Sequence, residues 1–288
     1  MLDEITPGLM VRYLIKKISV YSTVGYFYLR RMIKQHPALR KKWTYDKKAG
    51  IAFERFIKEI PSDKVFVHVS LSAVRSFTPG PDVYNYLRNL LQDRFSLVVS
   101  QAFTPKVRKT KVFDPEREIP AYGAFARQFF RDSQFRNYDP CYSVMARGTY
   151  DFKKGDLSFS RGGIFRQMAD QNFYCLNIGL DYVTCSLIHL VEYEQQVPYL
   201  DFYDDECIIR EKGQDTLLRY PIHANRPAYS VKGFVWWNKI RLKRDLAKTS
   251  IVRTHKAGGV LLYAFSMQEL HHFVTEKVKA DPYYLIKW

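Results

Sequence analysis

The stretch DKVFVHVSLSAVRSF, residues 63–77, predicts a strand that runs directly into a helical turn. Its VFV run is typical of a buried strand, and SAVRSF is typical of the start of a helix. A strand that ends in this way presents free backbone N–H groups, which suit a phosphate or a developing oxyanion. His68 and Ser70 would stand at the strand's end, where open α/β sheets place their ligands. On these letters alone, an ordinary strand end with a serine cap is the favoured interpretation.

Strands and helices alternate along the rest of the chain. Apolar runs rich in β-branched and aromatic residues predict further strands at 95–103, 141–148, 172–180 and 258–266. Apolar residues at helical spacing predict helices at 52–60, 82–91, 122–132, 183–196 and 267–281. Polar and basic residues predict loops at 104–120 and 198–250. This order favours an α/β protein, a three-layer α/β/α sandwich around a central mixed sheet.

Length and composition limit the class of protein. A chain of 288 residues, 47% of them hydrophobic, is large enough for one α/β domain with a real core. The four cysteines show no CxxC spacing, which predicts reduced thiols without a disulfide framework or a metal site. The start, MLDEITPG, is unlike a secretory signal, and no apolar run reaches the roughly 18 residues that a membrane span needs. We therefore expect a cytoplasmic protein.

The first part of the chain is strongly basic. Residues 1–50 contain 11 Lys or Arg against three Asp or Glu, so they hold eight of the 16 net positive charges. Tyr, Phe and Trp lie among these charges, as in an interfacial helix on anionic lipid, and residues 8–43 would form it on the inner face of the membrane. An amphipathic helix packed on its own domain explains the pattern equally well. Nucleic acid is not expected, because no RNA-binding signature accompanies the charge.

A boundary between two parts of the chain follows from this change in composition. We predict a helical extension over residues 1–48 and an enzyme domain over residues 49–288. The stretch Lys47-Lys48-Ala49-Gly50 is interpreted as the linker between them.

The predicted helix at 183–196 contains a candidate catalytic pair. Residues three, four and seven apart share a face of a helix, so Cys185, His189 and Glu192 would lie on one stripe. A neutral imidazole is the usual general base near neutral pH, and a carboxylate beside it fixes its tautomer and stabilises the imidazolium. A histidine packed in the core explains the same spacing. Cys185, at i−4 to His189, is an alternative covalent nucleophile.

A third segment, residues 113–148, has the order Phe-Asp-Pro, a helix that starts with Gly, an Arg, Asp-Pro, a Ser and a Gly. Together the three pieces resemble the aminoglycoside 3-N-acetyltransferase family, acyl-CoA-dependent antibiotic N-acetyltransferases, from about residue 51 to about residue 275. The family's V-H-x-S-L strand end is matched by Val67, His68, Ser70 and Leu71. Its F-D-P, helix, R-S-x-H-P-x-x-S and Gly are matched by Phe113 to Pro115, Arg136, Pro140, Ser143 and Gly148. Its T-x-L-H-x-A-E is matched by Ser186, Ile188, His189, Val191 and Glu192.

The resemblance implies roles for these residues. His189 and Glu192 would act as a general-base pair on the substrate amine, with acetyl-CoA or another acyl-CoA as co-substrate and no metal. The cofactor site would be formed by His68, Val69, Ser70, Leu71, Ser72 and Ser143. Backbone N–H groups near Ser70 to Ser72 would stabilise the oxyanion, and the basic loop with Arg108, Lys109 and Lys111 would lie near the CoA phosphates. The acceptor side would include Arg136, Tyr138 and Asp139.

Three departures make the chain a divergent member with a basic N-terminal extension. Asp139 stands where the family has a histidine before proline, LQDRFS replaces a glycine-rich stretch, and the basic leader has no family counterpart. Asp139 could pair with an ammonium group of the acceptor, or hold a turn together with Arg136.

The acceptor is predicted from the leader and from Asp139. We expect the amine of a small amino sugar, nucleotide- or lipid-linked, in surface polysaccharide biosynthesis. Three alternatives stay open: an aminoglycoside-antibiotic acetyltransferase, a ping-pong acyltransferase that uses Cys185, and a non-catalytic module that binds anionic lipid or polymer.

Overall fold

The computed structural model describes residues 44–229 and 237–286. The predicted interfacial helix over residues 8–43 lies outside the described residues, as does most of the predicted helical extension over 1–48.

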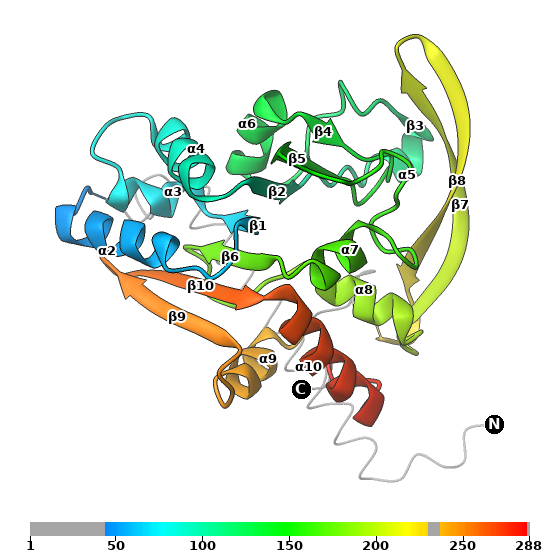
Figure 1. Cartoon of the computed structure of the whole chain (residues 1–288). Helices are drawn as coiled ribbons and strands as arrows, with labels where there is room; N and C mark the ends of the chain where they lie inside the picture. The colour runs from blue at the N-terminus through cyan, green and yellow to red at the C-terminus, as the bar shows by residue number, and fades with distance from the viewer. Residues whose placement is uncertain (1–43, 230–236, 287–288) are drawn as a thin grey trace.

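A mixed seven-stranded sheet forms the centre of the molecule (Figure 1), in the order β4-β5-β2-β1-β6-β10-β9. The three middle strands, β2, β1 and β6, are parallel, and every outer pair is antiparallel. The bounds are β1 Lys64–Val69, β2 Leu97–Gln101, β4 Phe135–Arg136, β5 Val144–Gly148, β6 Tyr174–Ile178, β9 Val252–Ala257 and β10 Val260–Ser266. The structure confirms the predicted strands that form this sheet and adds β4 and β9.

Helices cover both faces of the sheet, because successive side chains of the central strands point to opposite sides. On β1, Phe66 packs into the core under α7 Ile164–Asp170, α8 Leu187–Glu194, α9 Lys239–Leu246 and α10 Met267–Ala280. Val65 and Val67 pack into the opposite core, under α2 Lys47–Lys58, α3 Leu71–Val74, α4 Val83–Arg94 and α6 Ala124–Asp132. A 3₁₀ turn, η2 Arg75–Phe77, follows α3 directly. The predicted three-layer α/β/α sandwich is therefore confirmed.

The predicted linker at Lys47–Gly50 is wrong, because these residues form the first turn of α2. The Asp46 side chain caps this turn by accepting hydrogen bonds from the backbone N–H groups of Lys48 and Ala49, at 2.9 and 3.2 Å. Ala49 and Gly50 are buried, and a Cβ on Gly50 would lie 3.2 Å from the Phe77 carbonyl oxygen. The main domain thus begins before the lysines that were interpreted as its linker.

A long hairpin occupies about half of the predicted loop over 198–250. Its strands, β7 Leu200–Glu211 and β8 Gln214–Asn225, arch along one side of the molecule (Figure 1). The hairpin continues a second, three-stranded sheet with β3 Val112–Phe113, which follows α5 Val107–Thr110 in the other predicted loop. A short turn, η3 Pro227–Tyr229, follows β8. This second sheet has a small core of its own, in which Val107 and Phe113 meet Cys141 and Tyr220.

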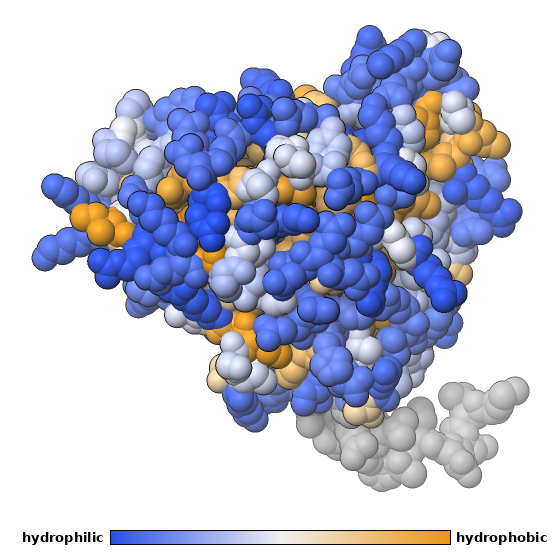
Figure 2. Space-filling view, viewed as in Figure 1, coloured by the Kyte–Doolittle hydropathy of each residue, from blue (hydrophilic) through white to orange (hydrophobic). Residues whose placement is uncertain are grey.

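The surface seen in Figure 2 is mainly hydrophilic, with hydrophobic residues in separate groups. Among the described residues, no helix combines the length and the apolar character that crossing a membrane requires.

Candidate active site

His189 lies in the first turn of α8 and Glu192 lies one turn later on the same face. The His189 Nδ1 atom is 2.8 Å from the Glu192 Oε2 atom. The Glu192 side chain is 2% exposed, whereas that of His189 is 27% exposed. The pair is therefore anchored in the core through Glu192 and is exposed to solvent on the histidine side.

Two further side chains fix the carboxylate of Glu192. The Tyr199 hydroxyl and the Trp237 indole N–H donate to its Oε1 atom, at 2.7 and 2.8 Å. Burial alone would raise the pKa of Glu192, but the hydrogen bonds from His189 and Tyr199 bring it below its usual value. The carboxylate thus stays charged beside the imidazole, as a base-orienting group must.

Aromatic rings surround the His189 imidazole. The ring centroid of Trp237 lies 4.5 Å away, and those of Phe159 and His223 lie 5.6 Å away. His223 comes from β8 of the hairpin and stacks on Tyr142 at 5.5 Å. Burial, with a smaller contribution from the neighbouring His189, lowers the pKa of His223 to about 4. At neutral pH the second imidazole is therefore uncharged, and His189 is the ring with a carboxylate partner.

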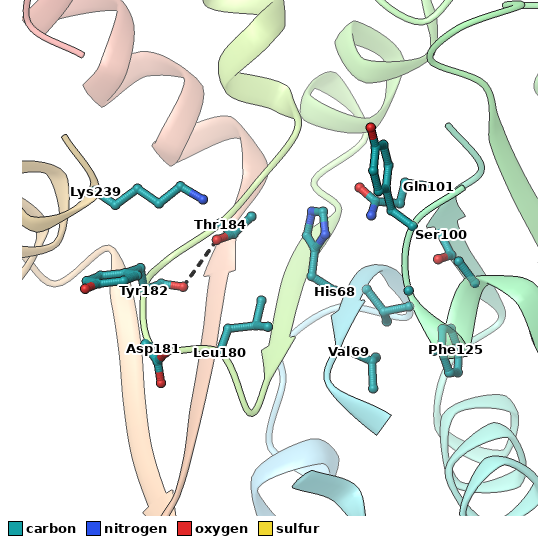
Figure 3. Close-up of a pocket in the computed structure, with 14 residues that line it drawn as sticks. His68, Val69, Ser100, Gln101, Phe125, Leu180, Asp181, Tyr182, Thr184 and Lys239 are labelled. Carbon is teal, nitrogen blue, oxygen red and sulfur yellow. Dashed lines mark hydrogen bonds between the residues drawn. The ribbon is translucent and has the colours of Figure 1, made fainter. Parts of the chain in front are cut away.

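A pocket of about 520 Å³ opens at the carboxyl ends of the parallel strands. His68 and Val69 enter it from β1, Ser100 and Gln101 from β2, and Lys239 from α9 (Figure 3). In the sheet, β1 lies between β2 and β6. The chain passes from β1 to β2 on one side and later returns to form β6 on the other side, so the pocket lies where the strand order reverses. This is the usual ligand site of an open α/β sheet.

A tight turn after β6 brings further lining residues to this pocket. Gly179 has φ +69°, and a Cβ there would lie 2.3 Å from the Ala73 Cβ. Only glycine permits this close approach to α3. The chain can therefore turn at once and place Leu180 and Thr184 in the pocket wall.

The pocket and the His189–Glu192 pair are neighbours. The Ser186 Oγ atom lies 3.5 Å from the Gln101 Oε1 atom in the pocket wall. Ser186 immediately precedes α8, and its carbonyl accepts the His189 N–H at 3.0 Å, so His189 lies about one turn further along. On the other side, Trp237 contacts the pair while Lys239, two residues on, lines the pocket.

The predicted cofactor residues divide into three groups. His68 and Val69 line the pocket. Ser70, Leu71 and Ser72 form the turn behind it, where the Ser70 N–H donates to the Ile178 carbonyl at 2.8 Å and the two serine hydroxyls lie 3.2 Å apart. Ser143 is fully buried under Arg136. The strand-end motif thus supplies the pocket through His68 and Val69.

The Arg136 side chain is buried and hydrogen-bonded inside the protein. Its guanidinium donates to the Ser143 hydroxyl at 3.0 Å, to the Ala102 carbonyl at 2.9 Å and to the Glu118 carbonyl. It also lies over the rings of Phe113 and Phe130. Burial lowers the pKa of Arg136 to about 10, so it remains charged at neutral pH. This side chain ties the end of β2 to the loop before α6, and we do not propose it as a contact to the acceptor.

Asp139 also holds a turn, as one alternative predicted, but it does so through backbone N–H groups and not together with Arg136. Its carboxylate accepts the backbone N–H groups of Cys141, Tyr142 and Ser158 at 3.2, 2.7 and 3.0 Å. The turn that it holds presents the Tyr142 ring to His223. Tyr138, the third predicted acceptor residue, instead donates to Glu211 in the hairpin.

The predicted phosphate-binding loop meets the hairpin. Lys111 pairs with Asp205 at 2.5 Å, and Arg108 donates to the Tyr203 hydroxyl at 2.8 Å. Arg108 also helps to lower the pKa of His223, which places its charge on the His189 side of the molecule.

Cys185 does not share the helical face of His189, because α8 begins at Leu187. Its side chain is fully buried, and all four cysteines are free thiols. Its neighbour Cys175, which interacts with the Cys185 thiol, has a pKa raised well above the usual value, chiefly by burial. We therefore do not propose a covalent cysteine route. The part of the chain that the structure describes contains no group of three His, Cys, Asp or Glu side chains able to hold a metal ion.

Tyr199, Trp237, Tyr142 and His223 were missed in the sequence. They contact the pair from the turn before β5, from β8 and from the segments that flank the hairpin, and no local spacing relates them to His189. The only hint was the Trp236-Trp237 dipeptide, which is unusual for a loop.

Solved structures share this architecture. An apo structure of the aminoglycoside acetyltransferase AAC(3)-IVa has a TM-score of 0.62 and 18% identity, and covers 85% of this chain and 92% of its own. AAC-VIa with bound sisomicin has a TM-score of 0.64 and 16% identity, covering 82% and 98%. A binary complex of AAC-IIIb with CoASH has a TM-score of 0.62 and 15% identity, covering 82% and 97%. At these identities the likeness shows the fold.

A search of the curated proteins finds no match to the sequence. The family model described as aminoglycoside 3-N-acetyltransferase matches residues 66–279, about three quarters of the chain, including the pocket strands and the His189–Glu192 pair. The chain therefore belongs to the aminoglycoside 3-N-acetyltransferase family, and is an acyl-CoA-dependent N-acetyltransferase.

Proposed function

We propose that the protein transfers an acetyl group from acetyl-CoA directly to an amine of an amino sugar, with His189 as general base and Glu192 as the group that orients it. The observation that carries this proposal is the pair itself. A buried, charged carboxylate, fixed by Tyr199 and Trp237, holds the Nδ1 atom of a partly exposed imidazole beside the strand-end pocket.

The chemical step needs one base. The amine nitrogen attacks the thioester carbonyl carbon, and His189 accepts the amine proton at Nε2 while Glu192 stabilises the imidazolium. The tetrahedral intermediate then collapses, the C–S bond breaks, and the thiolate of CoA leaves and takes up a proton. The products are the acetylated amine and free CoA. A thiolate is a good leaving group, so a strong general acid is not required.

The pocket suits the acyl-CoA co-substrate. Its polar lining includes the imidazole of His68 and the ammonium of Lys239, which can meet the amides and the anionic groups of CoA. The pocket ends next to Gln101 and Ser186, about one helical turn from His189. A thioester that enters along the strand ends would therefore reach the base.

Aminoglycoside-type amino sugars have more support as acceptors than surface-polysaccharide sugars. The relatives include AAC-VIa with bound sisomicin, whereas the polysaccharide hypothesis depended on the basic leader and on Asp139. Residues 1–43 of the leader lie outside the described residues. The Asp139 carboxylate already accepts three backbone hydrogen bonds. The rings of Trp237 and Tyr142 beside His189 suit an acceptor that carries an ammonium group, because aromatic faces attract cations.

The test is a product assay with a matched control. The protein is incubated with acetyl-CoA and, separately, with sisomicin, gentamicin and glucosamine, and acetylated amines are identified by mass alongside thiol release. We expect an acetylated amine with at least one acceptor and a loss of about 100-fold or more in His189→Ala, the usual contribution of a general base.

His271→Ala is the control, because His271 also pairs with a glutamate, Glu194 at 2.6 Å, but it belongs to α10 and does not line the pocket. It should keep most of the wild-type rate. The proposal fails if no amine is acetylated, or if His189→Ala and His271→Ala have the same rate.

A further inference from the structure

His68 has an unsatisfied polar atom inside the pocket. Among the described residues its Nε2 is a buried side-chain polar atom without a hydrogen-bond partner, and so are single atoms of Gln92 and Thr275. Of these three side chains, only His68 lines the strand-end pocket. Buried polar groups are almost always paired, because an unpaired one destabilises the folded protein. A cost of this kind is expected where a ligand supplies the missing partner.

The surroundings of His68 determine its chemical state. The Phe66 ring meets it edge-on at 4.9 Å, and Lys239 acts on it from α9 across the pocket. Burial, aided by the Lys239 charge, lowers the pKa of His68 to about 3. Near neutral pH the ring is therefore an uncharged imidazole with one N–H donor.

The position of His68 indicates which ligand atom it meets. The predicted oxyanion donors were the backbone N–H groups near Ser70, but the Ser70 N–H already donates to Ile178 and this turn is not part of the pocket lining. His68 is the last but one residue of β1 and points into the pocket between Thr184 and Gln101 (Figure 3). Gln101 in turn reaches Ser186 at the start of α8. The side chain thus faces the path along which a thioester would approach His189.

We propose that His68 is a further catalytic residue, which donates a hydrogen bond from Nε2 to the thioester carbonyl oxygen of acyl-CoA. This inference rests on the proposed function. Because that oxygen gains negative charge when the amine attacks, the bond strengthens in the transition state. The pantetheine amides offer the same kind of oxygen, so the experiment must separate the two sources.

The first measurement is binding without an acceptor. Calorimetry with acetyl-CoA and with free CoA compares wild type, His68→Leu and His68→Gln. We expect His68→Leu to bind acetyl-CoA about tenfold more weakly and CoA less than twofold more weakly, because only the first has a thioester carbonyl. Equal losses for both ligands would assign the bond to an amide and overturn the thioester assignment. Unchanged affinity for both would overturn the role of His68 altogether.

The second measurement is stability, which separates a ligand-directed histidine from a structural one. Removing the unpaired nitrogen should raise the Tm of the ligand-free protein by about 2–6 °C in His68→Leu, while the shift caused by acetyl-CoA shrinks. His255→Leu is the control. His255 lies in β9 and stacks on Phe56 of α2, on the other face of the sheet. It should not raise Tm, and it should keep the full acetyl-CoA shift. A fall in Tm with a full ligand shift in His68→Leu would contradict the proposal.

Kinetics complete the test. Loss of one oxyanion donor should lower kcat about 100-fold in His68→Leu without removing the acid limb of the pH profile, which belongs to the base. Glutamine places an amide N–H near the Nε2 position, and asparagine places one near Nδ1, so His68→Gln should recover more activity than His68→Asn. Equal activity of the two amide variants would exclude Nε2 as the donor. The binding arms need no acetylated product, so they remain decisive even if no acceptor reacts.

Discussion

At the scale of single residues, surroundings divide the histidines of this protein into different roles. His189 has a charged carboxylate at Nδ1 and is partly exposed, whereas the Nε2 atom of His68 is buried without a hydrogen-bond partner among the described residues. The sequence predicted the His189–Glu192 contact because two residues three apart on a helix must meet. It could not predict Tyr199 and Trp237, which reach Glu192 through the tertiary fold. The sequence also predicted Arg136 as an acceptor residue, whereas its side chain is buried. A motif indicates that an arginine occurs at a position, but it does not indicate whether the side chain faces inward.

The buried state of His68 predicts how stability depends on pH. Its pKa is lowered from 6.5 to about 3, so below pH 6.5 the unfolded chain takes up a proton that the folded chain refuses. Stability from this group is complete above pH 6.5 and is lost as the pH falls toward 3. At about pH 5 the loss is about 2 kcal/mol. Urea unfolding at about pH 7.5 and pH 5 should show this loss in wild type and a smaller one in His68→Leu. The same pH dependence in both proteins would show that His68 is not buried and neutral.

At the scale of elements, the sequence predicted the buried central strands and missed the β7–β8 hairpin. The runs VFV and LVV are buried on both faces, so they appear as continuous apolar strands. The hairpin was missed because few of its strand residues are buried and its carboxylates pair with basic side chains, as in Lys111–Asp205 and Arg226–Asp201. Its turn is formed by Lys212 and Gly213, both with positive φ, and Lys-Gly is a much weaker signal than Asn-Gly.

The start of α2 gives a prediction at this scale. Asp46 caps the helix with two hydrogen bonds, and its own N–H donates to the Ser76 carbonyl at 2.9 Å. Asp46→Ala should lower the free energy of unfolding by about 1 kcal/mol, the usual effect of losing an N-cap. Asp46→Asn keeps the capping oxygen and should lose only a few tenths of that. If both variants are as stable as wild type in chemical denaturation, residues 47–50 behave as a linker after all.

At the scale of the whole molecule, the fold brings distant residues to one place. β1, β2 and β6 end at the same edge of the sheet, so His68 and Gln101 share a pocket, and the turn after β6 starts α8 beside them. The alternation of strands and helices predicted these layers, and the order of three short motifs predicted the family. The rings of His223 and Trp237 beside His189 could not be predicted, because their positions depend on how segments distant in the sequence pack against each other.

The most direct test of the central claim is a double-mutant cycle on the His189–Glu192 pair. The rate of acetyl transfer from acetyl-CoA is measured for wild type, His189→Ala, Glu192→Gln and the double variant, with the acceptor that the product assay identifies. If Glu192 acts through His189, the double variant should be about as slow as His189→Ala alone, because residues that work as a unit are not additive. Losses that multiply, or a Glu192→Gln variant as fast as wild type, would contradict the account.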